Sequence, residues 1–276
     1  MLKKLMKYDF KSVFKLWWIG ALSTFILSFV AGGFLSFFAT EKELPAPVLV
    51  VAVFALIIVY IGFLAFPIFS DILVYVRFYK NLYTDQGYLT FTLPVKRQSI
   101  LNSKVFLGFI ATMATGLVLG INSIIMTLIG FREVIFTKEF LDEIKIIIDE
   151  IAAYEYNYFI IIYLVEALVM FALLSLVGWL FNYGCISVAS VIVKKAKILV
   201  AIAIYYGATS ILGFVFTIFY LFGLTSMVSV FANLSELAVL GSIALFILIV
   251  IFILCAACAI FYYVNYWCLH KKLNLA

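Results

Sequence analysis

Few residues of this chain combine the type and the spacing that chemistry requires. Cys255 and Cys258 are separated by two residues, which is the spacing of redox-active and zinc-binding cysteine pairs. They lie inside a long apolar segment, and the chain has one histidine, His270. Cys185 and Cys268 also lie in or beside apolar segments. We therefore interpret all four as small buried apolar residues and expect no metal site and no disulfide.

Glu166 is the second candidate, because it is an acid inside an apolar segment long enough to cross a membrane. Acids at that depth are costly and mark functional sites by default. Three interpretations stay open: Glu166 pairs with Asn122 or Asn182 at a seam between helices, lines the path of a cargo, or relays protons. The apolar segments hold no histidine-rich, paired-aspartate or serine–lysine group, so we expect no catalytic residue.

The composition shows what surrounds these residues. Hydrophobic residues make up 67% of the 276 positions and charged residues 12%, with a mean hydropathy of +1.23. Soluble domains carry about twice that share of charge. Apolar segments of more than 20 residues without alternation indicate membrane-spanning helices rather than barrel strands. The expected fold is an all-α integral membrane protein.

Six segments are long and apolar enough to cross a bilayer. They are approximately 17–38, 47–69, 105–130, 157–180, 198–222 and 238–264. The stretch 198–264 carries a single charge, Glu236. We expect a re-entrant segment around Gly213–Ser235, with Gly213, Gly223 and Thr225-Ser226 as break points, because three full spans there would place the C-terminal lysines outside.

The orientation follows from the lysines and arginines. Fifteen flank the spans on one side, in the N-terminal stretch, the loop after the second span, the loop after the fourth span and the tail. Four lie on the other side: Lys42, Arg132, Lys138 and Lys145. Since positive loops stay in the cytoplasm, both termini are predicted to be cytoplasmic. This distribution also accounts for the net charge of +5, so we expect no nucleic-acid partner.

Two amphipathic segments lie outside the predicted spans. In 1–16, apolar residues recur at helical spacing opposite five lysines, which predicts a helix in the cytoplasmic interface. In 131–156, seven acids and three bases accompany an apolar face, which predicts an acidic external helix over the outer mouth of the protein. That face consists of Phe140, Leu141, Ile144, Ile147, Ile148 and Ile151. Either a gate at an exit or a lid without a transport role fits this second helix.

The cytoplasmic loop 71–104 is the most informative stretch. Its first part continues helically from the second span, with Tyr75, Phe78, Tyr79 and Leu82 on one face. Gly87 suits a left-handed helix cap, and Pro94 suits the first turn of a following helix. The pattern predicts a helix-turn-helix elbow that protrudes into the cytoplasm. Its aromatic and charged side chains would suit docking onto another protein.

Within this loop, residues 83–104 read YTDQGYLTFTLPVKRQSILNSK. An acidic turn and Gly-aromatic-Leu lead to Leu-Pro, a basic pair and Ile-Leu-x-Ser-Lys. This pattern resembles the membrane subunits of bacterial type-2 ATP-binding-cassette exporters. The basic amphipathic N-terminus, six spans and chain length are similar as well. The resemblance covers the layout of the whole chain but only about 25 residues in specific sequence.

The resemblance implies a single permease domain over 1–276 in the bacterial plasma membrane, and a division of labour. A separate ATPase subunit would bind ATP and magnesium, and this chain contains no Gly-x-x-x-x-Gly-Lys-[Ser/Thr] phosphate loop. The elbow would contact that ATPase through Lys80, Asp85, Gln86, Gly87 and Tyr88. A second permease, identical or paralogous, would pack near spans one and five. Their small residues suit close contact: Ser23, Ser28, Gly32, Gly33, Ala201, Gly207, Ala208 and Gly213.

A hydrophobic or amphipathic cargo, above all a membrane-active peptide, fits spans rich in Phe, Leu, Ile and Val. Lipid-facing positions need the same residue types, so composition does not single out a cargo. Two other classes stay in view. One is an ion- or proton-coupled secondary transporter that uses Glu166, and the other is a sensor or assembly protein of the membrane without transport.

Overall fold

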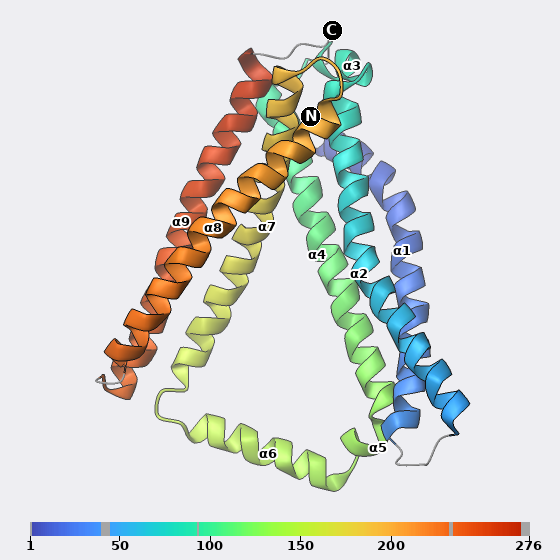
Figure 1. The fold of residues 1–276 in the computed structure, drawn as a ribbon, viewed down its shortest axis with the longest axis vertical. Helices are drawn as coiled ribbons and strands as arrows, with labels where there is room; N and C mark the ends of the chain where they lie inside the picture. The colour runs from blue at the N-terminus through green and yellow to red at the C-terminus, as the bar shows by residue number, and fades with distance from the viewer. Residues whose placement is uncertain (1, 40–44, 93, 232–233, 272–276) are drawn as a thin grey trace. The chain divides into compact units, whose positions relative to one another are not determined.

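The protein is described by a computed structural model that covers residues 2–39, 45–92, 94–231 and 234–271. Over these ranges the chain forms nine α-helices and no strand (Figure 1). The helices are α1 (Leu2–Ala39), α2 (Ala46–Tyr83), α3 (Gln86–Thr92), α4 (Arg97–Gly130), α5 (Arg132–Ile135), α6 (Lys138–Ala153), α7 (Tyr158–Ile192), α8 (Lys197–Phe231) and α9 (Glu236–Lys271).

Six of these helices are long and apolar enough to cross a membrane: α1, α2, α4, α7, α8 and α9. They have 34 to 38 residues each. At 1.5 Å per residue such a helix is about 51–57 Å long, whereas a bilayer with its headgroups is about 40–45 Å thick. The predicted all-α fold with six spanning helices is confirmed, and the helices are long enough to extend beyond the membrane.

The predicted re-entrant segment is the main correction to the fold. Helix α8 continues through Gly213 and Gly223 as far as Phe231, so the expected break points lie inside one helix. A glycine in a helix costs about 1 kcal/mol relative to alanine. Opening the helix in lipid would leave backbone groups unpaired at several kcal/mol each, which is the larger cost. Residues 232 and 233, at the end of the predicted segment, lie outside the described ranges.

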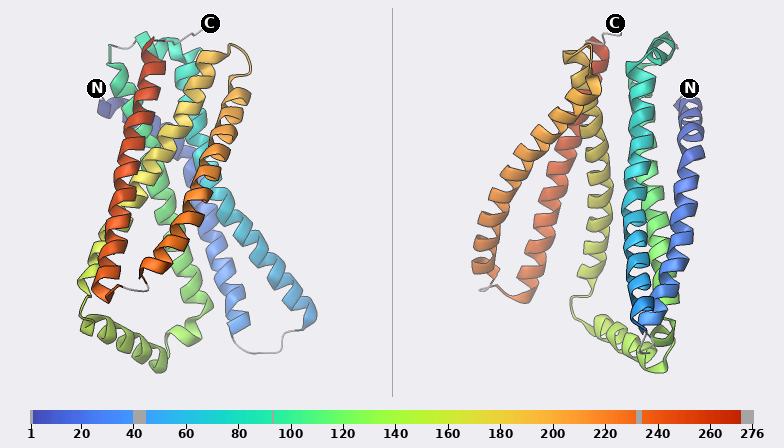
Figure 2. Two further views of the ribbon diagram at one scale, coloured as in Figure 1. Left: turned by 60° about the vertical axis from the view of Figure 1, so that its left-hand side comes forward. Right: turned by 45° about the vertical axis from the view of Figure 1, so that its right-hand side comes forward.

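The amphipathic segment predicted over 1–16 forms the first turns of α1 rather than a separate helix, because α1 is continuous from Leu2 to Ala39. The left view of Figure 2 shows these first turns running at an angle to the rest of the helix. All five lysines of the segment are exposed, whereas Val13 and Trp17 are buried. The predicted helical pattern is confirmed, and its place in the membrane interface stays a prediction.

The chain divides into two compact units. The first comprises residues 1–77 and 106–154, and the second comprises residues 78–105 and 155–276. Helices α2 and α4 each contribute residues to both units. The elbow predicted from the sequence therefore falls largely in the second unit.

The first unit is held together by an apolar core and by glycines that bring helices close. Trp17, Ala21 and Phe66 form the buried centre of the contact among α1, α2 and α4. Gly32 of α1 lies so close to α4 that an added Cβ would be 2.8 Å from the Cβ of Ile129. In the absence of a hydrophobic drive between helices in lipid, such close backbone approach supplies the attraction.

Polar side chains connect the same three helices at intervals of about two turns. The indole N–H of Trp17 donates to Thr115 Oγ1 (3.0 Å), and that hydroxyl donates to Ser70 Oγ (3.0 Å). Seven residues further along α1 and α4, Asn122 Nδ2 donates to Thr24 Oγ1 (3.1 Å). This spacing matches the heptad at which one helix face returns to its neighbour.

In the second unit, α7 packs extensively against α9 and also against α8. Phe181 of α7 contacts both partners, with ring centroids 5.3 Å from Phe261 of α9 and 5.9 Å from Tyr205 of α8. Gly184 leaves room beside Asn265 of α9. The result is a three-helix group on which the elbow residues are anchored.

Candidate functional site

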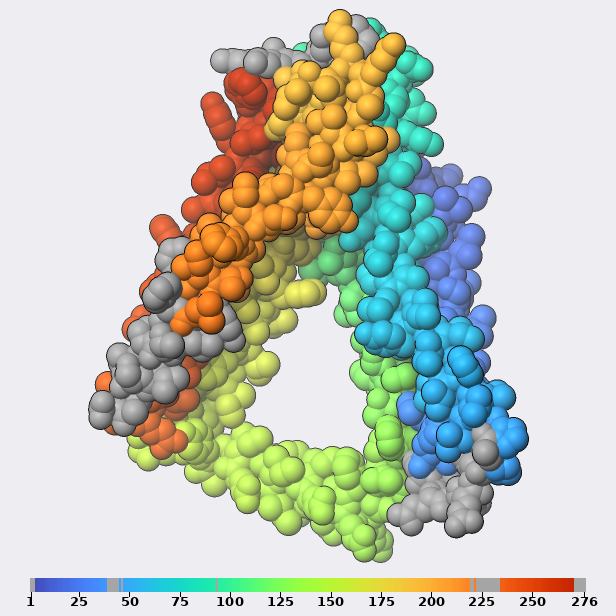
Figure 3. All heavy atoms as spheres, in the orientation of Figure 1, coloured from blue at the N-terminus to red at the C-terminus, as the bar shows by residue number. Residues whose placement is uncertain are grey.

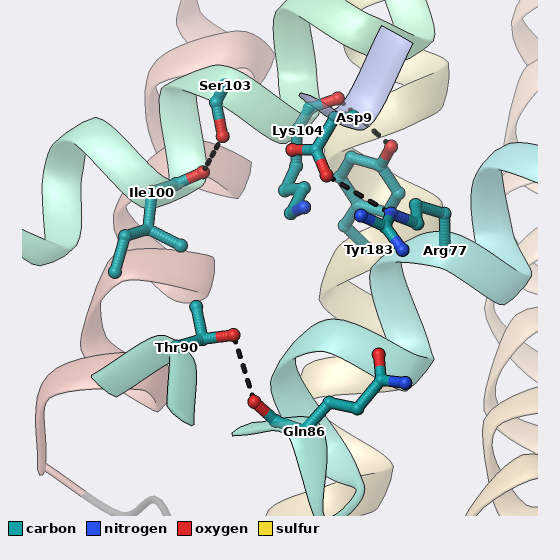
Figure 4. Close-up of polar contacts among 8 residues, drawn as sticks. All are labelled: Asp9, Arg77, Gln86, Thr90, Ile100, Ser103, Lys104 and Tyr183. Atoms are coloured by element: carbon teal, nitrogen blue, oxygen red, sulfur yellow. Dashed lines mark hydrogen bonds and ion pairs between the residues drawn. The ribbon is translucent and has the colours of Figure 1, made fainter. Parts of the chain in front are cut away.

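The elbow consists of the last turns of α2, the short helix α3 and the first turns of α4. Only Thr84 and Asp85 separate α2 from α3. The hydroxyl of Thr84 donates to the carbonyl of Lys80 (2.6 Å), and the amide N–H of Gly87 donates to the carbonyl of Thr84 (2.7 Å). Thr90 Oγ1 donates to the Gln86 carbonyl (3.0 Å; Figure 4), which supports α3 internally. These local bonds fix a tight reversal.

Four of the five predicted contact residues lie on the outside of this reversal. Lys80, Asp85, Gln86 and Tyr88 are exposed. Leu89, which the sequence analysis did not single out, is the most exposed large hydrophobic side chain of the elbow at 72%, beside Tyr88 at 55%. An exposed aromatic and an exposed leucine, flanked by both signs of charge, form a surface suited to another protein. We call Lys80, Asp85, Gln86, Tyr88 and Leu89 the elbow tip.

Two conformational predictions for the elbow are wrong. Gly87 is buried inside α3, and no described glycine has a positive φ, so it does not form a left-handed cap. Gly87 suits this buried position because it has no side chain. Pro94 lies in the link before α4, which begins only at Arg97, so it is not in the first turn of that helix.

The aromatic face of the elbow also points elsewhere than expected. Phe78 and Leu82, which we assigned to docking, are fully buried. Phe78 stacks on Tyr183 of α7 with ring centroids 3.8 Å apart and an interplanar angle of 11°. These residues therefore fasten the elbow to α7.

A chain of buried hydrogen bonds adds to this anchor. The Tyr83 hydroxyl donates to Ser187 Oγ (2.7 Å), and Ser187 donates to Asn265 Oδ1 (3.1 Å). Asn265 Nδ2 donates to the Leu180 carbonyl (2.8 Å), so α2, α7 and α9 are linked in one network. The Tyr183 hydroxyl donates to the Lys104 carbonyl of α4 (3.1 Å; Figure 4). Satisfied buried networks of this kind favour a single rigid arrangement.

Arg97 anchors the far side of the elbow. Its Nη1 donates to the carbonyls of Leu269 and His270, in the last turn of α9. The final carbonyls of a helix lack intrahelical partners and carry partial negative charge, so a guanidinium is a favourable cap. Arg97 also lies over the Phe91 ring at 5.6 Å, and Tyr262 donates to Asn102 Oδ1 (2.9 Å) nearby. Sequence reasoning gave Arg97 only a topological role.

The ion pair between Asp9 and Arg77 belongs to the first unit. Arg77 Nε lies 3.1 Å from Asp9 Oδ1, and the Asp9 side chain is almost fully buried (Figure 4). The pair joins the first turns of α1 to α2. The sequence analysis missed it because Asp9 is an acid within the basic N-terminal segment.

Glu166 lies in α7 with 5% of its surface exposed, and its Oε2 has no hydrogen-bond partner. One turn earlier, Tyr163 donates to the Leu240 carbonyl of α9 (2.8 Å). The amide of Asn122, one of the expected partners, instead donates to Thr24 of the first unit. The bond of Asn122 to Thr24 does not decide among the seam, cargo-path and proton-relay interpretations of Glu166, and all three stay open.

Among the described residues, no group of three or more histidine, cysteine or acidic side chains is placed to hold a metal ion. The four cysteines, all within the described ranges, are not in disulfides. Cys185 and Cys268 are buried as expected, but Cys255 is exposed and Cys258 half-buried, so those two are not core residues.

Comparison with known proteins gives no match. No family model, no curated protein sequence and no solved structure matches this chain. The geometry described above therefore carries the functional argument for a multi-pass helical membrane protein.

Proposed function

We propose that this chain is the membrane subunit of an ATP-driven exporter, and that the elbow tip receives force from a separate ATP-binding-cassette ATPase. The observation that supports this most is the contrast within the elbow. The tip is exposed, whereas the residues directly behind it, Phe78, Leu82 and Tyr83, are buried. A small exposed tip on a rigid base transmits motion to the helices that hold the base.

The route of that motion follows the anchors. Tyr83 connects to α7 and α9 through Ser187 and Asn265, and Arg97 connects to the end of α9. A displacement of α3 is therefore passed to α7 and α9, which both cross the membrane. ATP must bind the two arrangements of the transporter unequally for this to shift the equilibrium between them. ATP and magnesium are held by the partner ATPase, and no catalytic residue is assigned to this chain.

A second permease, identical or paralogous, completes the proposed exporter in the bacterial plasma membrane. The structure narrows which small residues are free for such pairing. Gly32 already packs against α4, whereas an added Cβ at Gly33, Gly207 or Gly213 would meet nothing within 4 Å. We assign Gly33 of α1 and the two glycines of α8 to the proposed pairing surface, and a membrane-active or otherwise amphipathic peptide to the role of cargo.

Photo-crosslinking from the tip tests the proposal. A benzoylphenylalanine replaces Tyr88 in the full-length protein, expressed in its native host, and crosslinked chains are identified by mass spectrometry. The expected adduct is a nucleotide-hydrolysing subunit. The matched control places the same photoprobe at Lys195, an exposed residue of the α7–α8 link, where this adduct should be absent.

The functional arm uses Asp85→Lys in vesicles that contain this chain and the crosslinked ATPase. We expect stimulation of ATP hydrolysis to fall at least several-fold while membrane insertion is unchanged. Gly87→Pro is less suitable, since it removes the N–H that bonds to Thr84 and disturbs the elbow itself. No hydrolase adduct from position 88, or unchanged stimulation in Asp85→Lys, would contradict the exporter proposal.

A secondary transporter is the competing function, and the buried carboxyl of Glu166, whose Oε2 has no hydrogen-bond partner, favours it. Glu166→Gln keeps the shape of the side chain and removes its ability to carry a proton. Ion-coupled transport would be abolished by this change, whereas ATP-driven export would retain most of its rate. Full transport by the variant across a range of pH removes the proton-relay interpretation.

A further inference from the structure

Helix α6 presents an apolar face that is not buried. The face comprises Phe140, Leu141, Ile144, Ile147, Ile148 and Ile151, as predicted. Phe140 is half-buried, and the other five are between 38% and 58% exposed. Figure 3 shows α6 in yellow-green. Exposed apolar faces of this size mark contact with a partner or with lipid.

The connections of α6 keep it close to the membrane surface. Four residues, 154–157, join Ala153 to Tyr158, the first residue of spanning helix α7. Those five Cα–Cα steps reach at most about 18 Å when fully extended. At its other end, α6 follows α4 through the short helix α5 and its flanking residues. Because α4 and α7 both cross the membrane, α6 is held within reach of the headgroup layer.

The two connections between α6 and the spanning helices carry exposed aromatic residues. Phe131 and Phe136 on one side, and Tyr154 and Tyr158 on the other, are between 39% and 69% exposed. Aromatic side chains concentrate at the membrane–water boundary, where their rings sit at headgroup level. Leu128 at the end of α4 and Ile161 at the start of α7 are exposed as well. Exposed apolar side chains therefore continue along the chain from α6 into the spanning helix at each end.

The charges of α6 define which kind of contact is involved. Its polar face has five acids and two lysines, so attraction to anionic headgroups does not hold it in place. Burial of the apolar face in lipid is therefore the remaining driving force. Because α6 is tethered to a spanning helix at both ends, it does not lose the translational freedom that a separate peptide loses when it binds a membrane. The helix is also preformed, since Thr137 Oγ1 caps it by accepting from the Phe140 N–H (3.3 Å).

We propose that α6 is an interfacial helix whose isoleucine face is embedded among the lipids of the leaflet at which α4 ends. Its acidic face then points to water on the side opposite the cytoplasmic elbow. This inference depends on the membrane-spanning helices and not on the proposed exporter function. The proposal replaces the expected lid over the outer mouth with a helix that contacts lipid.

Tryptophan quenching in lipid vesicles tests the proposal with the full-length protein. Ile144→Trp places a reporter at the centre of the apolar face, and Asp142→Trp places the matched control on the opposite side of the same helix. The four native tryptophans contribute equally in both variants and in the parent protein. Phosphatidylcholine with brominated acyl chains reports lipid contact, and neutral acrylamide reports water contact without being repelled by the acids.

The expected result is at least twofold stronger quenching of the added tryptophan by brominated lipid at position 144 than at 142, with the opposite order for acrylamide. Ile148→Trp provides a second reporter on the same face, should Ile144→Trp fold poorly. A reporter at 144 or 148 that acrylamide reaches as easily as at 142 would overturn the proposal in favour of a solvated helix. Shielding from both quenchers would overturn it in favour of a protein covering, such as a second copy of the chain.

Discussion

The first turns of α1 and the helix α6 have similar sequence patterns and different surroundings. Both alternate apolar and charged residues at helical spacing, and both adjoin a spanning segment. In α1, Trp17 is buried against Phe66 and Phe14 packs against the same cluster, while Asp9 pairs with Arg77. In α6, every residue of the apolar face except the half-buried Phe140 is exposed.

This difference shows that amphipathicity predicts a helix with one apolar face but does not say what covers that face. Lipid, a neighbouring helix and a second chain all satisfy the same pattern. In α1 the covering is supplied by α2 and α4 of the same unit. If this difference is real, substitutions at covered positions should destabilise the protein more than substitutions at uncovered ones. Four substitutions test this, and the effect of each is measured by thermal unfolding in detergent micelles.

Trp17→Ala should have the largest effect, because it empties a buried site and removes the hydrogen bond to Thr115. Loss of a buried tryptophan costs about 3–5 kcal/mol. We expect a marked fall in the unfolding temperature, with Trp18→Ala, at an exposed neighbouring position, as the control. Equal falls in unfolding temperature for Trp17→Ala and Trp18→Ala would contradict the burial of Trp17.

Gly32→Ala compares a covered with an open position in one helix. The new Cβ would lie 2.8 Å from the Cβ of Ile129 and 3.2 Å from the Met126 carbonyl oxygen, so α1 and α4 must separate. Overpacking of this kind costs about 1–3 kcal/mol. Gly33→Ala meets nothing within 4 Å and should be neutral or stabilising by up to about 1 kcal/mol, through helix propensity. Similar losses at both positions would contradict the α1–α4 packing.

Asp9→Asn should lower the unfolding temperature less, and the size of this loss should depend on salt concentration. The substitution removes the charge that faces Arg77. Because the Arg77 side chain is about a quarter exposed, solvent screens the pair, and we expect a loss of about 1 kcal/mol or less. The loss should shrink as salt is raised, and Arg77→Gln should show a similar trend. A loss independent of ionic strength would indicate that packing rather than charge holds this contact.

Ile147→Ala should have the smallest effect on unfolding. Ile147 is 54% exposed, and substitutions at exposed sites without special contacts usually change stability by about 0.5 kcal/mol or less. Val13→Ala, at a buried position of α1, is the matched substitution and should cost more. A large loss at Ile147 would show that another part of the protein or a second copy covers α6.

Several features of the fold and the elbow were predictable from the sequence. Long apolar segments predict spanning helices because backbone groups in lipid must be paired internally. Five of the six predicted spans lie within observed helices, and the sixth, 157–180, begins one residue before α7. The turn near Asp85 and the exposure of Lys80, Asp85, Gln86 and Tyr88 also agree with the structure. Contact of these residues with an ATPase stays a prediction.

Other features of the candidate site were not predictable. The positions of Ser187 and Asn265 in apolar helices were visible in the sequence, but nothing local indicates that Tyr83 bonds to one and, through it, to the other. Phe78 was assigned to docking because an aromatic helix face has the same sequence pattern whether it packs on α7 or on a separate protein. Gly87 was assigned to a cap because its burial is invisible in one dimension.

The sequence by itself determined that lipid surrounds most of the chain, how many helices span the membrane and which helix faces are apolar. These features depend on composition and on periods of a few residues. The tertiary structure decided which faces are covered, that Arg97 caps α9, that Phe78 and Tyr83 fasten the elbow, and that Gly32 rather than Gly33 serves a helix contact. Those outcomes depend on residues up to 173 positions apart. Their proximity is fixed by side-chain packing between helices, which no local pattern encodes.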